Sequence, residues 1–128
     1  MIIGRESTDI ELAEPEVRDL ISEGFSDTEL AGKRVLVIIP DSTRTAPMPL
    51  MFRLLQEILG GRTEALDFLV ALGTHPSMDD KALSELVGAK VTHGRVVESH
   101  VLNHRWDDPE TFTVLGNIPA EEVERISE

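Results

Sequence analysis

The sequence contains no cysteine. Disulfide bonds, thiolate metal sites and a cysteine nucleophile are therefore excluded, and we expect a reducing, cytoplasmic location. Its apolar runs are far shorter than the ~20 residues that a membrane-spanning helix needs, so no membrane partner is expected. The N-terminus, MIIGRESTDIELAEPE, lacks the basic start and the long apolar core of a secretion signal.

Basic residues are also scarce, with 12 Lys and Arg against 24 Asp and Glu and a net charge of −12. The Lys and Arg residues do not cluster, as phosphate backbones would require, so we expect no nucleic acid partner. The acidity itself is typical of a soluble protein. An anion would need a local site here, which draws attention to each arginine near a loop tip.

The chain of 128 residues has the size of a single domain and can bury a core without covalent links. Short apolar runs rich in β-branched residues alternate with segments whose apolar residues recur at helical spacing. The pattern predicts helices over 14–25, 47–59 and 78–87 and from residue 119, strands over 34–39, 66–72, 95–101 and 111–116, and an edge strand or hairpin within 1–12.

The run RVLVII at 34–39 is continuously apolar, which is typical of a strand that is buried on both faces in a parallel sheet. Strands alternate with helices after it, and such units connect with right-handed crossovers. The sequence therefore predicts an α/β fold: a three-layer Rossmann-like domain with a mostly parallel sheet.

Polar loops follow three of the predicted strands. They read DSTRT at 41–45, GTHPS at 73–77 and NHRWDD at 103–108. Ligands of open parallel sheets bind outside the carboxyl ends of the strands, so these loops should share one edge.

Asp41 and Arg44 lie three residues apart in the first loop. A guanidinium matches a carboxylate or phosphate, and Asp41 can hold that guanidinium or a neighbouring imidazole. Thr43 adds a hydroxyl, and the helix that follows offers free N–H groups to an anion. In the alternative interpretation, Asp41 and Ser42 cap a turn and Arg44 pairs with a surface acid.

His75 in the second loop is a candidate for proton transfer, because histidine changes charge near neutral pH. Thr74 beside it can orient the ring, although a loop histidine without a role is the alternative. In the third loop, His104 and Asp107 are further candidates. We expect no metal site, since His100 and His104 are four residues apart on a predicted strand and thus do not share a face.

Other residues carry weaker signals. His93 is expected in a turn, and Trp106, the single tryptophan, is expected to cover the core or to wall a pocket. Dinucleotide-binding, P-loop and serine-hydrolase motifs are absent.

Two motifs at this spacing, DSTRTAP at 41–47 and ALGTHPSM at 71–78, resemble the nickel-pincer-nucleotide lactate racemase family. A loop with NH and acids follows before LG at 115–116, so the similarity covers roughly 33–116. The resemblance implies a two-domain enzyme that racemises or epimerises 2-hydroxy acids through proton-coupled hydride transfer. It also implies a nickel-pincer nucleotide whose tethering lysine is not in this chain.

The resemblance assigns roles to residues of both loops. It makes His75 a catalytic acid/base and Asp41 the catalytic residue that orients it. It places Arg44 against the substrate carboxylate, with Thr43 and Thr74 as further substrate-binding residues. Residues 1–128 are then one N-terminal catalytic-type domain of a longer protein, with 1–32 as an extension and first helix and 33–116 as the core. A C-terminal domain would be its partner, and the isolated domain would be inactive.

Two alternatives belong to other classes of protein. One is an independent carboxylate- or phosphate-binding module that uses Arg44 without catalysis. The other is a purely structural domain whose loops cap the sheet.

Overall fold

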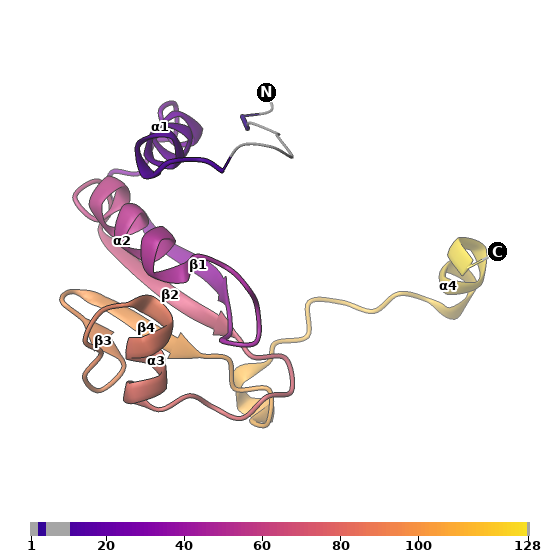
Figure 1. Cartoon of the computed structure of the whole chain (residues 1–128). Coiled ribbons are helices and arrows are strands. Elements are labelled where there is room, and N and C mark those ends of the chain that lie inside the picture. Colours follow the sequence, from indigo (N-terminus) through magenta and orange to yellow (C-terminus); the bar gives the residue numbers. More distant parts are fainter. Residues whose placement is uncertain (1–2, 5–10, 128) are drawn as a thin grey trace.

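The computed structural model describes residues 3–4 and 11–127. A four-stranded sheet forms the centre of this part, with helices packed against it (Figure 1). The elements are α1 (Glu14–Gly24), β1 (Arg34–Pro40), α2 (Met48–Leu59), β2 (Ala65–Ala71), α3 (Asp80–Val87), β3 (Arg95–Val96), β4 (Ser99–Asn103), the 3₁₀ turn η1 (Pro109–Thr111) and α4 (Ala120–Ser127).

The sheet has the order β1-β2-β4-β3 and is mostly parallel. β1 pairs with β2 in parallel from Arg34↔Ala65 to Pro40↔Ala71, and β2 pairs with β4 in the same sense. Only β3, at the edge, is antiparallel. The predicted α/β class and the mostly parallel, Rossmann-like sheet are confirmed.

The core lies between the sheet and the helices α2 and α3. Phe68 at the centre of β2 is fully buried, and its ring lies 4.5 Å from that of Phe52 on α2. The other large side chains that are fully buried are Leu54, Leu59, Val70, Val87 and Val101. Because side chains alternate along a strand, these contacts use one face of the sheet.

The residues that alternate with this core on β1 and β4 point to the opposite face. Leu36 is 52% exposed, Ile38 is 69% exposed and Leu102 is 44% exposed. In the described part of the chain this second face is therefore largely apolar and open to solvent, and the prediction that the strand at 34–39 is buried on both faces was wrong.

Helix α3 shows how local sequence fixes the loops around the sheet. The Asp79 carboxylate accepts a hydrogen bond of 2.8 Å from the Ala82 N–H and caps the first turn. The helix ends at Gly88, whose φ of 68° is left-handed. A Cβ on Gly88 would lie 2.6 Å from Cβ of Pro49, so only glycine fits where α3 meets α2.

Two strand predictions were wrong. The single strand over 95–101 is a hairpin of β3 and β4, because Val97 has a φ of 53° and turns the chain. Residues 112–116 form no strand, since no strand of the described chain lies beside them to pair with. The edge strand or hairpin predicted within 1–12 falls mostly on 1–2 and 5–10, outside the described residues.

The four predicted helices are present with slightly different bounds. None of them, over the residues described, has the length and apolarity to cross a membrane. After η1 the chain continues as an extended segment, and α4 at its end lies away from the sheet (Figure 1).

Candidate functional site

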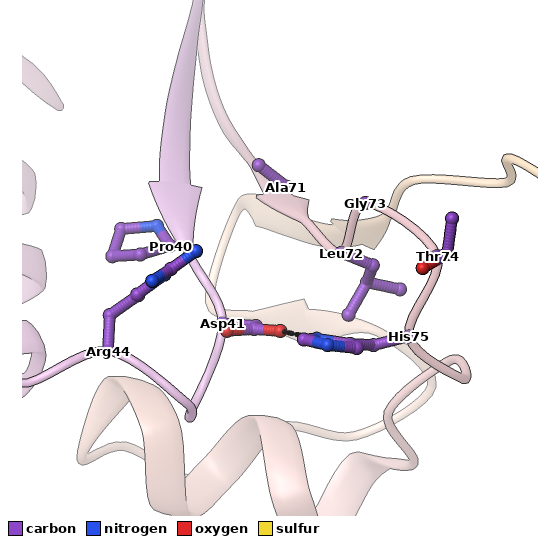
Figure 2. A pocket seen from close by; sticks show the side chains of 8 residues that line it. All are labelled: Pro40, Asp41, Arg44, Ala71, Leu72, Gly73, Thr74 and His75. Atoms are coloured by element: carbon purple, nitrogen blue, oxygen red, sulfur yellow. Dashed lines mark hydrogen bonds and ion pairs between the residues drawn. The ribbon is translucent and has the colours of Figure 1, made fainter.

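The candidate site lies where β1 and β2 end. Pro40 and Ala71 are register partners, so the loops that follow them start side by side at one edge of the sheet. These loops enclose a cavity of about 410 Å³ (Figure 2). Its lining residues are Pro40, Asp41, Arg44, Ala71, Leu72, Gly73, Thr74 and His75.

Asp41 and His75 are hydrogen-bonded across the cavity. Nδ1 of the His75 ring lies 2.5 Å from Oδ2 of Asp41, and no bond to Nε2 is formed within the described chain. The Asp41 side chain is 6% exposed, whereas that of His75 is 53% exposed. A buried carboxylate therefore holds one ring nitrogen and leaves the other available to a ligand.

The sharp turn after β2 brings His75 to this position. Gly73 has a φ of 61°, which glycine adopts without strain, and the His75 N–H donates to the Leu72 carbonyl over 3.0 Å. Thr74 lies between them and lines the cavity.

Thr43 stabilises the charge on Asp41. Its hydroxyl donates to Oδ1 of Asp41 over 2.6 Å, and its backbone N–H donates to the same atom over 3.1 Å. The Thr43 hydroxyl and, secondly, the His75 ring lower the pKa of Asp41 to about 2. Asp41 is therefore ionised at neutral pH and favours a proton on the nitrogen that faces it.

Arg44 lines the same cavity and is exposed. Figure 2 shows it on one side of Asp41, with His75 on the other. No carboxylate lies within ion-pairing distance of Arg44 among residues 3–4 and 11–127. The interpretation in which Arg44 pairs with a surface acid is thus wrong for these residues, and its guanidinium is free to bind an anion.

Asn103 at the end of β4 and Trp106 in the loop after it hold the loop that carries His75. The Asn103 amide accepts a hydrogen bond from the Met78 N–H over 3.0 Å and donates to the Met78 carbonyl over 2.9 Å. The Trp106 indole Nε1 donates to the His75 carbonyl over 3.1 Å. The loop is therefore fixed on both sides of Pro76.

The sequence pattern did not reveal these two roles. Asn103 was expected only as part of the third polar loop, and the expectation that Trp106 covers the core was wrong, because it is 44% exposed. The available signals were the Asn103 amide at a predicted strand end and the single indole of Trp106 near the loops. Neither signal predicts which backbone atoms the side chain bonds to.

His104 and Asp107 do not line this cavity. The His104 ring packs edge-on against Phe112 with centroids 5.9 Å apart, and Asp107 accepts a hydrogen bond from Arg105. The structure thus brings Asp41, Arg44, Thr74 and His75 together around the cavity, and Thr43 is hydrogen-bonded to Asp41. The predicted residues His104 and Asp107 lie outside the cavity.

A second histidine–aspartate pair, His100 with Asp67, lies on the open face of the sheet. Oδ1 of Asp67 accepts from the backbone N–H of His100 over 2.8 Å and lies 2.9 Å from its ring Nδ1. Nε2 of that ring lies 3.0 Å from Arg95. Both ring nitrogens therefore have protein partners, which suits a structural role.

The cavity has no attachment point for a lysine-tethered cofactor. The lysines of the chain are Lys33, Lys81 and Lys90, and none of them lines it. The described residues also contain no group of three or more His, Asp and Glu side chains that could hold a metal ion. A nickel-bearing nucleotide would have to be held by residues other than these.

A family model for lactate racemase N-terminal domains matches residues 7–127. The chain belongs to the lactate racemase N-terminal domain family. This confirms the resemblance seen in the two loop motifs and extends it beyond 33–116 in both directions.

A solved structure is also similar to this lactate racemase N-terminal domain. It is a crystal structure of a protein from Thermotoga maritima determined by the Northeast Structural Genomics Consortium, with 26% sequence identity and a TM-score of 0.73. The match covers 90% of this chain but only 27% of the other. Among curated protein sequences there is no match.

Proposed function

We propose that this chain forms the N-terminal catalytic part of a 2-hydroxyacid racemase or epimerase. The observation that carries the proposal is the hydrogen bond between Asp41 and His75 in a cavity that Arg44 also lines. Family membership supports the reaction class, and the geometry supports the role of each side chain.

The proposed role of His75 is to take the hydroxyl proton of the substrate. With Asp41 ionised, the neutral ring keeps its proton on Nδ1, so Nε2 carries the free lone pair. A positioned imidazole of this kind is a general base in one direction and a general acid in the other. Asp41 orients the ring and stabilises the imidazolium that forms.

Arg44 is the proposed anchor for the substrate carboxylate. Its planar fork of N–H donors fits the two carboxylate oxygens, and within the described residues it has no competing acid. A 2-hydroxy acid carries its hydroxyl on the carbon next to the carboxylate. One ligand can therefore reach both Arg44 and His75, with Thr74 at the cavity wall.

The remaining parts of such an enzyme are proposed to lie in other segments of a longer protein. This chain covers 27% of the similar Thermotoga maritima chain, and its lysines lie away from the cavity. A nickel-pincer nucleotide, by family resemblance, would supply the hydride acceptor. Residues 1–128 would then form one domain that is inactive alone and works with a C-terminal domain.

The test uses the full-length protein with its cofactor and compares His75→Asn with His93→Asn. His93 is an exposed turn residue outside the cavity, so its variant is a matched control. We expect His75→Asn to lower racemisation of lactate by about 10²-fold or more, and His93→Asn to leave it near wild type. Equal turnover of the two variants would remove the catalytic role of His75.

The free guanidinium favours a second candidate function, a carboxylate- or phosphate-binding module without catalysis. Two measurements together separate the candidates: a titration of lactate or phosphate into wild type and Arg44→Gln, and a turnover assay of the full-length protein. A module binds through Arg44 but shows no turnover in any full-length protein loaded with cofactor, whereas the enzyme shows both.

A further inference from the structure

Apolar side chains exposed to solvent are concentrated on two surfaces. The first is the open sheet face, defined by Leu36, Ile38, Leu69 and Leu102. The second is the C-terminal arm, defined as residues 112–127. Of the eleven large hydrophobic side chains that are exposed in the described chain, nine belong to these two surfaces. The six on the arm are Phe112, Val114, Leu115, Ile118, Val123 and Ile126.

The order of the strands explains why one sheet face is open. The path from β1 to β2 to β4 moves in one direction across the sheet. Right-handed crossovers along such a path place α2 and α3 on the same face. A third layer needs a segment from before β1 or after β4. Of the described segments, α1 packs against α2, where Glu14 pairs with Arg53, and this leaves the C-terminal arm.

The arm is long enough to reach across the open sheet face. It has eight residues between Thr111 and Ala120, which span up to about 26–29 Å when extended. β1 has seven residues, or about 23 Å at the usual rise of a strand. The segment is therefore long enough to bring α4 onto any part of the open sheet face.

Helix α4 has the surface that such a contact requires. Val123 and Ile126 lie three residues apart and therefore share one side of the helix. The acidic residues Glu121 and Glu124 lie on the other sides of the helix, where they stay in solvent when the apolar side is covered. The apolar side of α4 therefore complements the open sheet face.

We propose that the C-terminal arm docks on the open sheet face of its own chain and forms the third layer of the fold. Figure 1 shows the arm extended, so docking is a closing movement about residues 112–119. Pro40 and Ala71 lie on this face and also line the candidate cavity. The docked arm therefore walls one side of the cavity. The proposal does not depend on the catalytic function.

The absence of cysteine makes a disulfide test direct. In the full chain, Ile38→Cys with Val123→Cys introduces the only two thiols, and both replaced side chains are exposed. The matched control pairs Ile38→Cys with Glu124→Cys, the next residue around the helix. Both are oxidised at low protein concentration, and the products are separated on a non-reducing gel.

We expect an intrachain disulfide to form at least about tenfold faster with Val123→Cys than with Glu124→Cys, and urea to abolish the difference. Equal rates for the two pairs would overturn the proposal, because an undocked arm brings both positions to the sheet equally often. Mainly interchain dimers would also overturn it by assigning the face to a second copy. A second pair, Leu36→Cys with Ile126→Cys, repeats the measurement if the first variant does not fold.

Discussion

The loop that carries His75 should depend on the side chain of Asn103. Asn103→Ala removes two hydrogen bonds to Met78, of 3.0 and 2.9 Å, at a half-buried position. A neutral hydrogen bond contributes about 1 kcal/mol net, so the loss should be about 2 kcal/mol in the free energy of unfolding. For a domain of this size that corresponds to a fall of roughly 6–10 °C in Tm.

Urea unfolding followed by circular dichroism measures this loss, and Asn117→Ala is the control. Asn117 is exposed and lies outside every helix and strand, so its variant should stay within about 0.5 kcal/mol of wild type. The imidazole signals of His75 should also broaden or move in Asn103→Ala alone. If the two variants unfold at the same urea concentration, Asn103 does not hold the loop as the structure indicates.

Three further predictions concern charge, packing and backbone strain. Because the pKa of Asp41 is about 2, below the ordinary aspartate value of 3.8, ionised Asp41 stabilises the fold fully above about pH 4, and this stabilisation is lost as the pH falls towards 2. Urea midpoints of Asp41→Asn should therefore change less than those of wild type between pH 4 and 2, and parallel curves would contradict this. Phe68→Ala empties the centre of the core and should lower the free energy of unfolding by about 3–5 kcal/mol in urea titrations; a loss below about 1 kcal/mol would refute the packing described. Val97→Asn should raise stability by up to about 1 kcal/mol in thermal unfolding, since a β-branched residue is strained at a φ of 53° and asparagine is not, and a lower Tm would argue against that strain.

The sequence was most informative about the elements whose signals are local. The apolar runs that became β1 and β2 predicted two parallel strands, and their ends placed Asp41 and His75 at one edge. Helix α3 followed from the helical spacing of its apolar residues. In each case a short stretch of sequence carries the physical cause.

What could not be predicted depends on partners that are distant in the chain or on backbone geometry. Val97 belongs to a residue type that favours strands, yet it turns the chain between β3 and β4. Asn103 and Trp106 act through backbone atoms of the His75 loop, which no side-chain pattern reveals. The segment 112–116 has strand-like composition but no neighbouring strand in the described chain, so composition alone was misleading.

The central claim is that Arg44 and His75 face one ligand, and a lactate titration followed by NMR tests it most directly. The imidazole resonances of His75 are recorded in wild type and in Arg44→Gln as lactate is added. We predict a saturable shift of the Nε2 signal in wild type that disappears, or needs at least about tenfold more lactate, in Arg44→Gln. A His75 signal that does not respond to lactate, or that responds equally in both proteins, would contradict the shared site.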